Sequence, residues 1–161
     1  MTNSAVSLSE VLTEACSDIM GMFGISSTLL EETRSNEFNT KRYVHVAIGL
    51  THGLSGFIVL ELSKDFAWKL MSHMMGGMEI KELDPMAQSS LCEFTNMLAG
   101  SALIKLNSSE LIDLELPVIN INEAEEIQMI HNGPSVKLSF EINDADFHVN
   151  NSRFEISYCI H

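Results

Sequence analysis

A short pattern of residues occurs twice in this chain, and this duplication restricts the fold more than any other feature. In each copy three residues share one face of a helix, and each residue of the second copy lies 79 positions after its counterpart. The copies are Glu14, Ser17 and Gly21, followed by Glu93, Asn96 and Gly100. The same offset carries the apolar segment 56–63 onto 135–142. A helix and a strand that keep one offset indicate a duplicated helix–sheet unit.

Capping residues and apolar periodicity predict the elements of this unit. Three segments begin with helix-capping residues and continue with helical apolar spacing; they start at Ser7, Ser63 and Asp84-Pro85, and the last runs to about Leu106. Strands are predicted at 27–33, 42–50, 56–62, 113–121, 125–130, 135–142 and 153–160, with a polar loop after the first. The predicted fold is α+β, a mixed or antiparallel sheet with two pseudo-symmetric long helices packed on it. We expect one domain over 1–161 with repeat halves at about 7–63 and 85–142.

Charge and composition narrow the classes of partner. The formal net charge is −13, and the nine lysines and arginines form no cluster. Nucleic-acid binding requires a cationic surface that displaces phosphate counterions, and an anionic membrane surface would repel this chain. No segment is apolar over the length that spans a bilayer, and the first residues lack the features of a signal peptide. We therefore expect a cytoplasmic protein whose partner is another protein or a small molecule.

Cysteines and histidines give no indication of a metal site. Cys16, Cys92 and Cys159 include no CxxC pair and are expected to be reduced. The six histidines have neither the HxxxH nor the HxH spacing of a zinc site. We therefore predict no metal bound by this chain.

The longest predicted helix carries an unusual polar stripe. Its core face is formed by Leu91, Phe94, Leu98, Ala102 and Leu106. The opposite face carries Ser89, Glu93, Asn96 and Gly100, flanked by the apolar residues Met86, Met97, Leu103 and Ile104. A few polar groups within an apolar collar are typical of a protein-binding surface. The same spacing also fits an ordinary exposed helix on which Gly100 packs against a neighbouring helix.

Residues 89–100, "SSLCEFTNMLAG", resemble the active-site helix of the CheC/CheX/FliY family of chemotaxis phosphatases. The family pattern is Ser or Asp, three residues, Glu, two residues, Asn, and a Pro about twenty residues later. Here it corresponds to Ser89, Glu93, Asn96 and Pro117, with a gap before the proline slightly shorter than usual. The resemblance extends over the whole chain in length, element order and duplication. Because the first copy has Ser17 in place of the asparagine, the chain resembles a CheX-like member with a single active helix.

This resemblance implies a phosphatase that hydrolyses the aspartyl phosphate of a CheY-like response regulator. Asn96 would orient the attacking water, since an amide both donates and accepts hydrogen bonds without a change of charge. Glu93 would pair with the lysine of the partner's phosphorylation site. The remaining residues of the stripe and collar would contact the partner; they are Ser89, Met97, Gly100, Leu103 and Met86. The resemblance implies no cofactor in this chain, Mg²⁺ on the receiver domain, and a homodimer formed through sheet edges.

Two other interpretations remain open from the sequence. The same face could serve a non-catalytic adaptor that binds a receiver or a flagellar switch protein, because the degenerate first copy indicates that the fold does not need the catalytic pair. The duplicated sheet could also serve assembly alone. The sequence does not identify the response regulator or establish that the pathway is chemotaxis.

Overall fold

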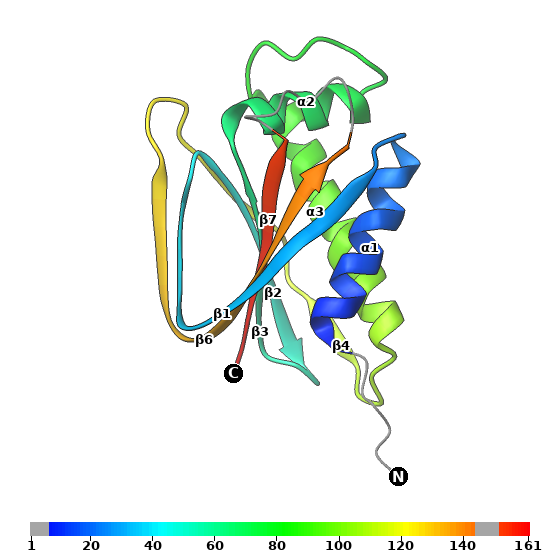
Figure 1. The fold of residues 1–161 in the computed structure, drawn as a ribbon, viewed down its shortest axis with the longest axis vertical. Coiled ribbons are helices and arrows are strands. Elements are labelled where there is room, and N and C mark those ends of the chain that lie inside the picture. Colours follow the sequence, from blue (N-terminus) through cyan, green and yellow to red (C-terminus); the bar gives the residue numbers. More distant parts are fainter. Residues whose placement is uncertain (1–6, 144–151) are drawn as a thin grey trace.

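In the computed structural model, which describes residues 7–143 and 152–161, an antiparallel sheet carries its helices on one face (Figure 1). The helices are α1 (Leu8–Met22), α2 (Lys64–Met74) and α3 (Pro85–Leu106). The strands are β1 (Ser27–Arg42), β2 (Val44–His52), β3 (Gly56–Leu62), β4 (Ile112–Leu114), β5 (Val118–Ile121), β6 (Ile127–Ile142) and β7 (Arg153–Ile160). Their order is β1-β6-β7-β3-β2-β4, and β5 also pairs with β2. The predicted α+β fold class is confirmed, and every strand pair is antiparallel.

Each helix begins where its capping residue predicts. The side chains of Ser7, Ser63 and Asp84 accept hydrogen bonds from the backbone N–H three residues ahead, which satisfies donors that have no partner within the helix. The longest helix ends at Asn107, which adopts the left-handed conformation with φ 51°. As Figure 1 shows, α1 and α3 lie side by side across the sheet, whereas α2 lies at one end.

The main core lies between the sheet and these two long helices. From β2, alternate residues face the helices and are buried, namely Val44, Val46, Ile48 and Leu50. On β6 and β7, the rings of Phe140 and Phe154 stack with 5.1 Å between their centroids. Burial of these side chains is the main stabilising contribution, at about 1.5–3 kcal/mol for each.

The strand order is symmetric about its centre and corrects the predicted alignment of the halves. β3 and β7 pair in the middle, β2 and β6 flank them, and the edges are β1 on one side and β4 with β5 on the other. By position β3 corresponds to β7, so the offset that carried 56–63 onto 135–142 holds for the helices but not for these strands. Part of this shift comes from unequal strand length, since β2 has 9 residues and β6 has 16.

The extra length of β1 and β6 forms a two-stranded ribbon, residues 37–42 paired with 127–132. The pairing is irregular between Ser35 and Glu37, and there the ribbon turns back over the sheet face that carries no helix (Figure 1). Phe38 is buried beneath it, against Val59 and Cys159. The polar loop predicted after residue 33 is wrong, because β1 continues to Arg42. Its side chains are mostly exposed, so no alternation of apolar residues marked it as a strand.

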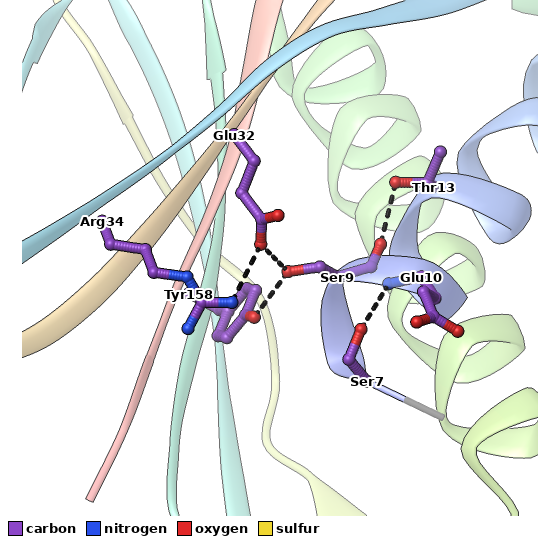
Figure 2. A network of polar contacts seen from close by, with 7 residues as sticks. All are labelled: Ser7, Ser9, Glu10, Thr13, Glu32, Arg34 and Tyr158. Atoms are coloured by element: carbon purple, nitrogen blue, oxygen red, sulfur yellow. Dashed lines mark hydrogen bonds and ion pairs between the residues drawn. The ribbon is translucent and has the colours of Figure 1, made fainter. Parts of the chain in front are cut away.

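Polar contacts attach the first turn of α1 to the sheet, as Figure 2 shows. The buried hydroxyl of Ser9 donates to the carboxylate of Glu32 on β1 and lies 2.7 Å from the hydroxyl of Tyr158 on β7. Arg34 also contacts this carboxylate, at 3.4 Å. The network therefore fixes the start of α1 over β1 and β7. Within the described residues, no helix is long and apolar enough to cross a membrane.

Candidate functional site

An open groove of about 490 Å³ runs along the N-terminal half of α3. One wall is α3 itself and the other is the segment that enters β5. The lining residues are Pro85, Gln88, Ser89, Cys92, Glu93, Asn96, Leu116, Pro117 and Ile119. All four residues of the sequence pattern, from Ser89 to Pro117, therefore meet at one groove, although twenty residues separate the helix motif from the proline.

The geometry of α3 places the polar residues on the groove. Leu91, Phe94, Leu98 and Ala102 are fully buried as predicted, whereas Leu106 is only partly buried. An α-helix has 3.6 residues per turn, so the burial of these side chains in the core places the motif on the opposite face of α3. The buried face therefore orients the functional face.

The opposite wall is held by the sheet. β4 and β5 both pair with β2, and between them the backbone N–H of Glu115 donates to the carbonyl of Gly49 at 2.9 Å. Gly49 has no side chain, and the carboxylate of Glu115 occupies the space that a Cβ would take. Pro117 lies two residues after Glu115 and directly before β5, so backbone pairing with β2 holds the chain on both sides of it.

The two predicted catalytic side chains form no polar interaction with the described parts of this chain. Glu93 is exposed and Asn96 is partly exposed. Within residues 7–143 and 152–161, neither side chain forms a hydrogen bond or an ion pair. Both can therefore contact a partner without first breaking an interaction in this chain.

Exposed apolar side chains surround the groove. Met86 on α3 is 66% exposed, and Leu116 and Val118 on the opposite wall are 88% and 59% exposed. Ile104 is 81% exposed but lies in a separate hollow at the C-terminal end of α3. Large apolar side chains this exposed and close to polar groups mark an interaction surface. Leu116 and Val118 were not predicted, although Leu116 directly precedes the proline of the motif.

Four of the predicted partner-binding residues do not line the groove. One of them, Met86, is exposed at the N-terminal end of α3. Met97 and Leu103 are partly buried and pack against the core. Gly100 lies beside β4, where an added Cβ would be 3.9 Å from the Leu114 side chain. Periodicity separates the two faces of α3, but it does not show that α1 and β4 cover its flanks.

The first copy of the pattern is also on the surface. Glu14, Ser17 and Gly21 are exposed on α1, as equivalent helices require. Lys105 of α3 lies 2.9 Å from Asp18 and 3.9 Å from Glu14, and the hydrogen bond to Asp18 raises the pKa of Lys105. The first copy therefore carries an interhelical ion pair next to Ser17. Elsewhere in the described parts of the chain, no three His, Cys, Asp or Glu side chains are grouped so as to hold a metal ion.

Comparisons with known proteins place this chain in a family. Residues 44–141 match the family model "Chemotaxis phosphatase CheX". The CheY-P phosphatase CheX of Thermotoga maritima is 33% identical over 106 residues, which are 63% of this chain and 67% of that protein.

Solved structures share the fold. The chemotaxis protein CheX from Desulfovibrio desulfuricans has a TM-score of 0.82 and 18% identity, over 97% of this chain and all of that one. A CheX–CheY–BeF3–Mg²⁺ complex from Borrelia burgdorferi matches with a TM-score of 0.65 and 16% identity, over 97% and 99% of the two chains. The family model covers well over half of the chain, so this protein belongs to the CheX family of chemotaxis phosphatases.

Proposed function

We propose that this protein hydrolyses the aspartyl phosphate of a CheY-like response regulator, with α3 inserted at the receiver's phosphorylation site. The observation that carries the proposal is the groove, in which Ser89, Glu93, Asn96 and Pro117 meet within an exposed apolar rim. The relatives support it by name, since the Thermotoga maritima protein is a CheY-P phosphatase and the Borrelia burgdorferi protein forms a complex with CheY.

The chemistry requires little from this chain beyond position and charge. A water molecule attacks phosphorus in line with the bond to the aspartyl oxygen, that bond breaks, and inorganic phosphate leaves. Asn96 is suited to hold this water, because its amide accepts a hydrogen bond from the water and donates another nearby. Holding the water in line supplies much of the acceleration, since positioning replaces an encounter in solution.

Glu93 would anchor the helix in the receiver. Its exposed carboxylate stands one helical turn from Asn96 and is available to pair with a cation of the partner. In this proposal the cation is the receiver's conserved lysine, and Mg²⁺ is held by the receiver and not by this chain. Ser89 and Pro117 complete the walls beside the inserted side chains.

The proposal is tested by phosphate release from a panel of phosphorylated receiver domains of the same organism. We expect the wild-type chain to accelerate release from one or a few receivers, and Asn96→Ala to abolish the acceleration while circular dichroism stays unchanged. Ser17→Ala is the matched control, because it alters the corresponding position on α1 and should keep full activity. Binding to a receiver without any acceleration would instead favour the adaptor, and wild-type rates in Asn96→Ala would remove Asn96 from the mechanism.

A further inference from the structure

A layer of ionisable side chains lies beneath the ribbon, on the sheet face that carries no helix. In the strand register His45 of β2 is opposite Glu61 of β3, and Glu61 is opposite Glu155 of β7. His45 and Glu61 are both 0% exposed, which is uncommon for ionisable groups. From the ribbon, Thr40 and Arg42 cover this row.

Two cations connect the layer to the ribbon. Lys137 of β6 has its Nζ atom 3.6 Å from Glu61 Oε2, and it also donates to the backbone carbonyl of Asn39 at 3.3 Å. Arg42 pairs with the carboxylate of Glu155. The attachment of the ribbon therefore depends on charge as well as on the apolar contacts of Phe38.

The buried groups of this layer are incompletely compensated. Ser157 donates to Glu61 Oε1 at 3.4 Å, a long hydrogen bond, and Glu61 Oε2 has no hydrogen-bond partner. Both ring nitrogens of His45 and the Oε2 atom of Glu155 are likewise without a hydrogen-bond partner in the described residues. On its other side His45 is opposite Asn120 of β5, which does not titrate. A buried polar group that lacks partners is destabilising, and more so when it is charged, so these positions favour neutral side chains.

We propose that the ribbon is a latch on the back of the sheet, and that its closure is controlled by the protonation of Glu61 and His45. Opening would expose the groups to water and uncover the apolar patch around Phe38 and Cys159. The ribbon continues through Tyr43 directly into β2, whose other edge pairs with β5 and so carries one wall of the groove. A change at the latch therefore acts on the strand that positions Pro117 and Ile119.

The two pKa shifts give closure of the ribbon two opposite dependences on pH, an alkaline limb from Glu61 and an acid limb from His45. Burial raises the pKa of Glu61, with Glu155 acting in the same direction and Lys137, Thr40 and Arg42 opposing it. Closure is then favoured while this carboxyl is protonated, and the contribution is lost as pH rises through its raised pKa. Burial lowers the pKa of His45, and the nearby charges of Arg42 and Lys137 act in the same direction. Closure is therefore lost as pH falls below 6.5, where the opened ring takes up a proton.

Hydrogen exchange of the full chain tests the latch between about pH 5 and 9, with rates corrected for intrinsic exchange. Between pH 4.5 and 6.5 the two effects offset each other in the wild-type chain, because opening releases a proton from Glu61 and takes one up at His45. In variants that keep only one of the two groups, protection of the ribbon amides, at 37–42 and 127–132, should fall on one side only: below pH 6.5 with His45 alone, and above about pH 5 with Glu61 alone. The fall should approach about tenfold for each pH unit over which one group titrates in one state only. Amides of β3 in the core should show no such profile.

Variants assign the two limbs. Glu61→Gln should abolish the alkaline loss of protection, and His45→Gln should abolish the acid loss. Glu37→Gln is the matched control, because Glu37 is an exposed carboxylate on the ribbon outside the buried layer, and it should keep the wild-type profile. A flat profile in both Glu61→Gln and His45→Gln, or one and the same profile in both variants, would overturn the proposal. If either variant fails to fold, NMR titration of the His45 ring in the wild-type chain decides: a ring that stays neutral well below its ordinary pKa supports the latch, and ordinary titration refutes it.

Discussion

Leu116 offers a direct test of how the groove binds its partner. It is 88% exposed and belongs to the wall opposite Asn96, so in the free protein its side chain contributes little to folding. Docking of a receiver against α3 would bury it. Leu116→Ala then loses about 1–2 kcal/mol of apolar burial, which corresponds to a rise in Kd of roughly 5- to 30-fold.

The assay is titration of a beryllofluoride-loaded receiver with each variant, followed by phosphate release at saturating concentration of the phosphatase. We expect Leu116→Ala to raise Kd and to leave the saturated rate unchanged, because Leu116 does not hold the water. Leu111→Ala is the matched control. Leu111 is the same side chain at 77% exposure, but it lies beyond the C-terminal end of α3 and does not line the groove. It should bind as the wild type does.

Two results would refute this reasoning. An unchanged Kd in Leu116→Ala would mean that the partner does not cover this wall. An equal loss in Leu111→Ala would mean that exposed leucines act through general stickiness and not through the groove. Neither variant should change the free energy of unfolding by more than about 0.5 kcal/mol, because both side chains are exposed; a larger loss would mean that the change in Kd reflects stability and not the groove.

Three further predictions follow from individual residues. Glu93→Lys should weaken binding of the loaded receiver by more than about tenfold, and more than Glu93→Ala, since it places a cation against the partner's lysine; unchanged affinity would contradict the assigned role. Gly56→Ala should lower the free energy of unfolding, measured in urea, by about 3 kcal/mol or more, because φ is +153° and the new Cβ would overlap the carbonyl oxygen of Cys159. Gly21→Ala is its control: the position has open space around it, and the change should stabilise α1 by about 0.5–1 kcal/mol. Finally, β1 lies at the edge of the sheet, and within the described residues only β6 pairs with it, so its other edge is open for pairing with a second copy. We expect sedimentation equilibrium to show a homodimer of twice 17.9 kDa, and a monomer mass that does not change with concentration would exclude it.

Local signals in the sequence predicted much of the fold and the centre of the site. Ser7, Ser63 and Asp84 begin helices because a side-chain oxygen at those positions satisfies backbone donors, a requirement that does not depend on tertiary structure. Glu93 and Asn96 were located by helical periodicity. Their meeting with Pro117 followed from the family pattern and not from any local signal.

What the sequence did not reveal depends on contacts between distant segments. The ribbon was missed because β1 is exposed over most of its length and so lacks the alternation that marks a half-buried strand. Met97 and Leu103 were placed in the collar because a helical projection does not include the neighbours that cover its flanks. Glu61 and His45 were not singled out, since their burial requires the ribbon to fold back over strands that are far from it along the chain.

Both walls of the groove rest on a single strand. α3 packs on β2 through its buried face, and β5 is hydrogen-bonded along the edge of β2. The spacing between Asn96 and Pro117 is therefore set by the packing of α3 on β2 and by the hydrogen bonds that attach β4, Glu115 and β5 to the same strand. A partner that enters the groove would meet walls already held in place by these contacts, so little conformational entropy would be lost on this side of the complex. Association should then be limited by diffusion and orientation, and any slow conformational step should belong to the partner.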